Sequence, residues 1–259
     1  MHKKAKPSPA MILFEFRTIT GNPYVHIFGV GMPVLMSVII AIAMRSAISD
    51  SSMLSTAITG MYLGIGTMIP LAAILMGYSA TYSQELEKGI PQRMALFGIS
   101  PIVTIINRII SEGIFLLLSF VIYFTVGFLV LDIDAPALSG FLCYALCILV
   151  LGVISFLLAH SIASFFQKFG ITYCISMILY FGIMIISGMM GISYEMLPSP
   201  VQVVAKLLPT TYITKDFADV WLGKDYNFMP LLQAFLFLGA MSGLFLFISL
   251  KKNGRKRFS

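Results

Sequence analysis

The sequence predicts an all-α polytopic membrane protein with six transmembrane helices. Hydrophobic residues make up 58% of its 259 positions, charged residues make up only 11%, and the mean hydropathy is +0.94. Soluble domains carry about 25% charged residues, so this chain cannot cover a globule of its size with polar groups. Six apolar segments of roughly 20 residues, the length that crosses hydrocarbon, leave no room for a nucleotide-binding domain.

Each apolar segment is predicted to be a helix, because in hydrocarbon every backbone N–H and C=O needs a partner within its own segment. Together the segments form one transmembrane domain over residues 1–259. The predicted spans are residues 24–44, 57–80, 101–131, 138–159, 170–188 and 229–250.

The basic residues predict the orientation of these spans. If both termini, residues 81–112 and residues 160–169 face the cytoplasm, that side holds thirteen Lys and Arg residues and the other side holds four. This bias follows the positive-inside rule, so we expect both termini in the cytoplasm. Basic clusters beside spans are typical contacts for anionic lipid. We expect no nucleic-acid partner, because a reading surface is also needed.

The chain lacks the motifs of a catalytic or metal site. Cys143, Cys147 and Cys174 lie in apolar runs without a zinc-type spacing and are expected to be free thiols. His160 lies at a span boundary and is expected to be hydrated. No hydrolase motif and no phosphate-binding loop occurs, so we expect no catalytic residue, metal or cofactor bound by this chain. The span interiors carry no charge at mid-depth, which argues against an ion-coupled carrier.

Residues 8–20 are predicted to form an amphipathic helix in the cytoplasmic interface of the membrane. Apolar residues recur at helical spacing from Ile12 to Ile19, Glu15 lies elsewhere on the helical wheel, and Asn22-Pro23 ends the pattern. A second interpretation, the start of the first span broken by a proline turn, stays open.

A short helix is predicted over residues 85–98, between the second and third spans. Pro91 suits its first turn and Gly98 suits its exit, and Met94 and Phe97 form an apolar edge. A short helix held between two rigid spans can serve as a handle for a partner. A solvated connector without a special role is the alternative.

The third helix is predicted to run from residue 101 to residue 131, about 46 Å against roughly 30 Å of hydrocarbon. Its cytoplasmic end therefore projects or tilts, and polar side chains share one face of that end. Arg108 can pair with Glu112 at i,i+4. This polar stripe either lines a cavity and supports the short helix or is a solvated extension. Its residues are Thr104, Asn107, Arg108, Ser111 and Glu112.

The outer segment before the last span is too long and too apolar for an ordinary loop. Over residues 198–222, prolines divide it into two short helices, and Thr214 is expected to cap the second one. With Trp221 at the water boundary, these helices are expected to lie on the outer leaflet or dip into it.

The connection between the second and third spans resembles the first cytoplasmic loop of type-2 ATP-binding-cassette (ABC) transporter permeases. Residues 84–89 read Gln-Glu-Leu-Glu-Lys-Gly, and Arg93-Met94 and then Gly-Ile-Ser-Pro at 98–101 follow. In that family a Glu-x-Glu-x-Gly stretch begins the coupling helix, which docks onto the ATPase subunit. Residues 90–92, Ile-Pro-Gln, depart from the Thr and further Glu common in the family.

A second stretch with the same resemblance lies before the last span. Residues 208–212 read Leu-Pro-Thr-Thr-Tyr, and Phe217 and Trp221 follow. This is similar to the Leu-Pro-x-x-Tyr pattern in the outer loop of the same permease family. The resemblance extends over the full length, from the interfacial helix to the basic tail.

The resemblance implies a non-catalytic membrane subunit of an ABC exporter in the bacterial inner membrane. Two permease subunits, identical or different, carry two cytoplasmic ATPase subunits that hold ATP and Mg. Such complexes export lipids, polysaccharides, antibiotics or antimicrobial peptides, some of them conferring antibiotic resistance. The residues expected at the ATPase are Glu85, Glu87, Lys88, Gly89, Arg93 and Met94, and those of the outer-loop motif are Pro209, Tyr212, Phe217 and Trp221.

The cargo is predicted to be amphipathic or lipid-like, because the spans lack charge at mid-depth. The resemblance places the first, second and fifth spans around the pathway, where methionines suit varied apolar ligands or serve as packing filler. Glycines of the second span allow close helix approach. A six-span secondary carrier or channel and a non-transporting immunity or assembly protein stay open as alternatives. The candidate pathway residues are Tyr62, Met184, Met189 and Met190.

Overall fold

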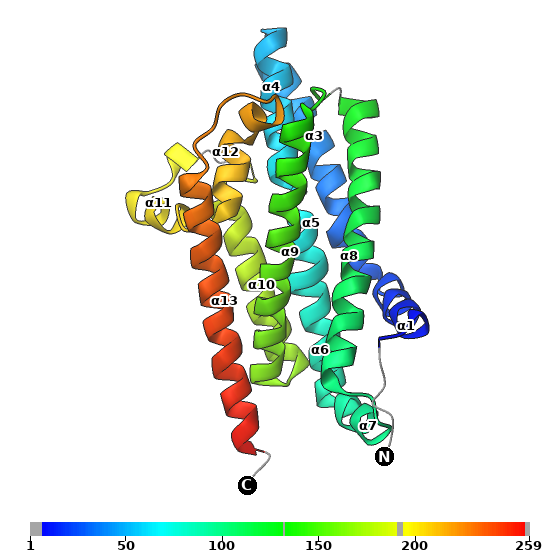
Figure 1. The fold of residues 1–259 in the computed structure, drawn as a ribbon. Coiled ribbons are helices and arrows are strands. Elements are labelled where there is room, and N and C mark those ends of the chain that lie inside the picture. The colour runs from blue at the N-terminus through cyan, green and yellow to red at the C-terminus, as the bar shows by residue number, and fades with distance from the viewer. Residues whose placement is uncertain (1–6, 132, 191–193, 257–259) are drawn as a thin grey trace.

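The computed structural model describes residues 7–131, 133–190 and 194–256, except the side chains of Tyr24, Ser52 and residues 253–256. Within these ranges six helices are long and apolar enough to cross a membrane, which confirms the predicted fold class. The long helices run side by side in one bundle (Figure 1). They are Ile27–Ala47, Met53–Glu87, Pro101–Leu131, Leu138–Phe166, Phe169–Ile186 and Met229–Lys252.

The first two spans consist of several helical pieces. α1 (Pro9–Thr20) and α2 (Pro23–His26) precede the first span, which joins the π-helical turn η1 (Ile27–Gly31) to α3 (Met32–Ala47). The second span runs through α4 (Ser51–Gly66), α5 (Met68–Pro70), the π-helix η2 (Leu71–Tyr78) and α6 (Ser79–Glu87). Pro70 has no backbone N–H to donate, so the regular hydrogen-bond ladder is interrupted where η2 begins.

The remaining elements follow without strands in the described part of the chain. They are α7 (Ile90–Leu96), α8 (Pro101–Val126) with the π-helical turn η3 (Gly127–Leu131), α9 (Leu138–Phe166), α10 (Phe169–Ile186), the 3-10 turn η4 (Tyr194–Met196), α11 (Ser199–Ala205), α12 (Pro209–Trp221) and α13 (Met229–Lys256).

The second span forms the centre of the bundle. In its most apolar stretch 89% of the residues are buried inside the protein, against 22% in the first span and 22% in the last. Glycines of α4 allow α12 to pack closely, as predicted: a Cβ at Gly64 would lie 2.8 Å from Thr214 Oγ1, and one at Gly60 would lie 3.3 Å from the Ala218 Cβ. The first and last spans therefore offer most of their surface to lipid or to another subunit.

The bundle has two distinct ends, named here after the helices that mark them (Figure 1). The α7 end carries α7, the turn between α9 and α10 and the C-terminal turn of α13. The α4 end carries the start of α4, the end of α8 and the connection from α12 to α13. α1 lies beside α8 near the α7 end.

Two predicted elements differ from the structure. The helix expected over residues 85–98 is instead the end of α6 and the separate α7, because Gly89 adopts a left-handed conformation (φ 67°) that ends α6. Thr214 does not cap a helix. α12 already begins at Pro209, and the Thr214 hydroxyl donates to the carbonyl of Thr210 at 2.9 Å inside it.

Candidate functional site

α7 is a seven-residue helix at the tip of the bundle, and none of its side chains is buried. Leu96 and the adjoining Phe97 are 87% and 85% exposed. Arg93 is exposed and donates from Nη2 to the carbonyl of Lys88 at 2.7 Å, while Met94 is half-buried. Exposed apolar side chains of this size mark contact surfaces. Phe97 was expected on an apolar edge, but Leu96 was not, because helical spacing alone does not show whether a leucine is exposed or packed.

The segment that leads into α7 is attached to two spans. Glu85 accepts a hydrogen bond from Arg108 of α8, and Glu87 Oε2 accepts one from the backbone N–H of Phe169 at 3.2 Å, at the start of α10. Glu85 and Glu87, like Arg93, were expected to contact an ATPase, and their side chains have partners within this chain. Lys88 is exposed, and Gly89 forms the turn.

Arg108 is the centre of a buried ion cluster at the α7 end. It is only 6% exposed, its Nε lies 3.1 Å from Glu15 Oε2 of α1, and its Nη2 pairs with Glu85 of α6. The pairing with Glu112 expected from the i,i+4 spacing is wrong, and so is the alternative of a solvated extension. One guanidinium thus joins three elements that are distant in the sequence.

Charge pairing explains why α1 lies where it does. Glu15 is the buried residue of α1, whereas Leu13 and Phe14 face outward. Burial raises the pKa of Glu15 above its usual range, and the charge of Arg108 opposes this rise. Breaking a buried ion pair by removing one partner costs about 3–5 kcal/mol, so Glu15 fixes α1 on α8. Whether α1 also lies in the membrane interface stays a prediction.

Aromatic side chains and a histidine surround the cluster. The Arg108 guanidinium carbon lies 5.2 Å from the ring centroid of Tyr82 and 5.8 Å from that of Tyr78. The Tyr78 hydroxyl hydrogen-bonds to His160 Nδ1 at 2.8 Å, and the His160 ring stacks on Tyr82 with centroids 4.8 Å apart. His160 is therefore buried rather than hydrated as expected, and it links α9 to the second span.

The rest of the polar stripe also holds α1. Ser111 Oγ donates to the carbonyl of Ile12 at 2.9 Å, and Asn107 Nδ2 lies 3.6 Å from Met11 Sδ. Glu112 is 4% exposed, and its Oε2 has no hydrogen-bond partner among the described residues. The stripe is a helix-docking face.

At the α4 end, the outer-loop motif forms α12. Pro209 occupies its first turn, Phe217 and Trp221 are fully buried, and the Tyr212 hydroxyl donates to the carbonyl of Lys206 at 3.1 Å. Trp221 faces the protein interior, where its ring stacks on Phe124 with centroids 5.5 Å apart, and its position at the water boundary stays a prediction.

Asp134 joins α12 to the second span. Its carbonyl accepts from Trp221 Nε1 at 2.7 Å, its carboxylate accepts from the Ser55 hydroxyl, and its N–H donates to Thr59 Oγ1 at 2.9 Å. Asp134 was not predicted as a contact residue, because the neighbouring sequence does not indicate partners so distant along the chain.

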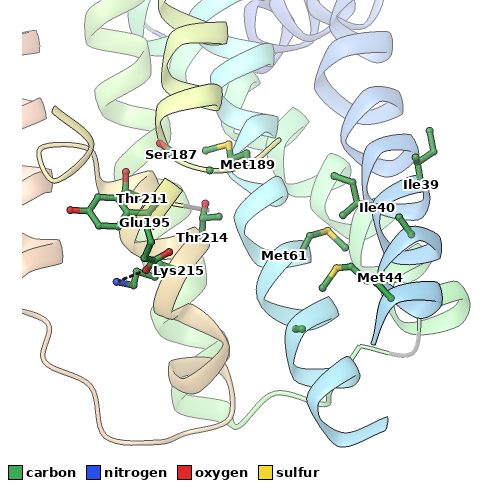
Figure 2. A pocket seen from close by; sticks show the side chains of 15 residues that line it. Ile39, Ile40, Met44, Met61, Ser187, Met189, Glu195, Thr211, Thr214 and Lys215 are labelled. Carbon is green, nitrogen blue, oxygen red and sulfur yellow. Dashed lines mark ion pairs between the residues drawn. The ribbon is translucent and has the colours of Figure 1, made fainter. Parts of the chain in front are cut away.

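A cavity of about 630 Å³ opens at the α4 end between α3, α4, α12 and the segment after α10 (Figure 2). Its apolar wall includes Ile39, Ile40, Met44 and Met61. The other wall carries hydroxyl and charged groups. They are Ser187, Tyr194, Glu195, Thr211, Thr214 and Lys215.

The candidate pathway residues fall in different places. Met189 lines the cavity and Met190 is 43% exposed, but Met184 is buried in the core. Tyr62 is fully buried, stacks on Tyr123 with centroids 4.0 Å apart and donates to the carbonyl of Tyr123. Tyr62 and Met184 therefore pack the interior of this chain rather than line the cavity.

The fold defines an all-α polytopic membrane protein. Its sequence matches the family described as ABC-2 family transporter protein over residues 50–251, and the chain belongs to this family. Neither a curated protein nor a solved structure matches the chain. The match confirms the resemblance seen in the two loops, and it identifies the chain as a permease, a membrane transport subunit that is not itself catalytic.

Proposed function

We propose that this chain is the permease subunit of an ATP-driven exporter in the bacterial inner membrane. The α7 end and both termini face the cytoplasm. Two ATPase subunits, which hold ATP and Mg, dock on α7, and a second permease subunit, identical or different, completes the complex. The chain supplies no catalytic residue.

The exposed surface of α7 carries this proposal. Leu96 and Phe97 are the kind of apolar side chains that a partner covers. Beside them, the Arg93 guanidinium can form a bidentate pair with a carboxylate of the partner. Lys88, Gly89 and Met94 complete the proposed docking surface.

The contacts behind α7 support a route for force from an ATPase to the spans. Glu85 and Arg108 connect the end of α6 to the third span, and Glu15 continues the connection to α1, next to the first span. Glu87 connects the same segment to the fifth span. Packed helices shift as rigid bodies rather than deform, so displacement of α7 moves these spans together.

The cavity at the α4 end supports an amphipathic or lipid-like cargo. Ligand cavities are commonly about 300–1,000 Å³, and this one pairs an apolar wall with a wall of hydroxyl and charged groups. Its lining comes from the first and second spans and from the segment that follows the fifth.

The docking surface can be tested with Leu96→Ser combined with Phe97→Ser. Each is an exposed anchor of the size that dominates interfaces, so we expect about tenfold or greater loss of ATPase co-purification and of cargo-stimulated ATP hydrolysis. Leu138→Ser is the matched control, because Leu138 is 77% exposed at the start of α9, away from α7. Unchanged binding and hydrolysis in the double variant, and in Arg93→Glu with Glu87→Arg, would reject the assignment of α7.

A further inference from the structure

In the lining of the cavity, the ammonium group of Lys215 lies beside a carboxylate and an aromatic ring. Lys215 Nζ lies 3.1 Å from Glu195 Oε1 and 5.1 Å from the ring centroid of Tyr194. A carboxylate beside an aromatic face is the chemistry that binds organic cations. Figure 2 shows the Lys215–Glu195 pair on the side of the cavity opposite Met61 and Met44.

This ion pair is exchangeable. The side chains of Lys215 and Glu195 are 48% and 63% exposed, and exposed pairs are worth little. A second hollow of about 570 Å³ adjoins the cavity, and Lys215 lines both. The second hollow also carries Asp216 and Asp219. Asp219 lies four residues after Lys215 on α12, so it can receive the lysine if Glu195 is taken.

The charges around the two hollows favour a cation. Three carboxylates line them (Glu195, Asp216 and Asp219), against the single ammonium of Lys215. Lys224 offsets part of this excess through its pair with Asp219 at 2.7 Å. A surface with a surplus of one sign raises the local concentration of the opposite ion.

The cavity also offers a surface for a hydrocarbon chain. The apolar wall with Ile40, Met44 and Met61 can cover an alkyl or aryl portion.

We propose that this cavity binds cationic amphiphiles, whose ammonium replaces Lys215 at Glu195 and Tyr194 while Lys215 turns toward Asp219. The inference rests on the proposed function only in treating the ligand as cargo. Binding itself needs no ATPase. Lys215 thus competes with the ligand for Glu195. Removing Lys215 should therefore tighten ligand binding, whereas removing the charge of Glu195 should weaken it.

The test is equilibrium binding to the full chain in nanodiscs, with dodecyltrimethylammonium, zwitterionic dodecylphosphocholine and neutral dodecyl maltoside as probes. We expect the cation to bind most tightly. Glu195→Gln should weaken its binding by up to about fivefold, because the ion pair between the carboxylate and the quaternary ammonium is lost. Lys215→Gln should tighten it by up to about fivefold, because an exposed ion pair no longer has to be broken. Lys206→Gln is the matched control, because Lys206 is exposed and lines neither hollow, and it should change binding by less than twofold.

Several results would overturn the inference. Equal affinity for the three probes, or unchanged binding in Glu195→Gln, would indicate mere partition into the apolar surface. Weaker binding in Lys215→Gln would indicate a structural role of Lys215. A separate transport assay with the ATPase present distinguishes the two proposals. ATP-driven export that is insensitive to Glu195→Gln rejects this site alone, and cation binding without ATP-driven export rejects the proposed function alone.

Discussion

The two ends of the bundle hold their charges in opposite ways. At the α7 end, Arg108 is 6% exposed and pairs with two carboxylates on two other helices. At the α4 end, Lys215 and Glu195 are both about half exposed or more and form a single pair. Buried pairs are costly to break, whereas exposed pairs exchange freely. The comparison indicates an α7 end that moves as a unit and an α4 end that can adjust to what it binds.

The two ends also position their short helices differently. α1 is fixed on α8 by charge and hydrogen bonds, whereas α12 is fixed by close approach of backbones. A Cβ at Gly140 would lie 2.4 Å from the carbonyl oxygen of Val220. Stability at the α7 end therefore depends on ionic partners, and at the α4 end it depends on packing.

The largest expected effect follows from removing the cation at the α7 end. Arg108→Gln leaves Glu15 and Glu85 in a buried site without their partner, and we expect a loss of about 3–5 kcal/mol in the free energy of unfolding. The measurement is thermal or denaturant unfolding in detergent. Lys215→Gln at the α4 end is the control and should change stability little. Equal effects at the two ends would refute the comparison.

A smaller effect is expected from crowding α12. Gly140→Ala places a methyl group against the backbone of Val220 and Trp221, and overpacking of this kind costs about 1–3 kcal/mol. Gly113→Ala is the matched control, because a Cβ there meets nothing within 4 Å. Unfolding of both variants is compared with wild type. If Gly140→Ala proves as stable as Gly113→Ala, close backbone packing does not hold α12.

Removing one hydrogen bond at the same place should matter less. Trp221→Phe keeps the aromatic stack on Phe124 but loses the donor to the Asp134 carbonyl, a cost of about 1 kcal/mol. The free energy of unfolding measures it. A loss as large as that of Arg108→Gln would mean that the α4 end also depends on a buried polar cluster.

The smallest effect is expected for an exposed ion pair. Lys224→Ala removes a partner of Asp219, and both side chains are more than half exposed, so we expect at most about 1 kcal/mol, reduced further by salt. Unfolding at low and high ionic strength provides the measurement. A large loss that salt does not reduce would show that charge at the α4 end is more strongly held than we argue.

Local sequence rules predicted the spans and the turns but not the long-range pairs. Hydropathy identified six helices, and Pro91 and Gly98 marked the short helix, although the predicted bounds of 85–98 began before the Gly89 turn. Arg108 was assigned to Glu112 because i,i+4 is the only pairing that one helix reveals. Its partners, Glu15 and Glu85, lie 93 and 23 residues away, and only the packing of three helices brings them together.

The same limit applies at the α4 end. Trp221 was placed at the water boundary on the general preference of tryptophan in membrane proteins, which does not reveal its contacts with Phe124 and Asp134. Glu195 of η4 and Lys215 of α12 lie on either side of α11 in the sequence, so no periodicity indicates that they pair beside a cavity. Met189, a candidate pathway residue, lines the cavity, whereas Tyr62 and Met184 face the interior.

The most direct test of the account is transport by reconstituted vesicles that contain this chain with or without its ATPase. Uptake of a panel of fluorescent amphiphiles is followed with ATP, with a non-hydrolysable analogue and with an imposed ion gradient. We predict uptake only when the ATPase is present and ATP is hydrolysed, and loss of that uptake in the Leu96→Ser, Phe97→Ser variant. Full uptake by the chain alone, driven by the gradient, would contradict the account.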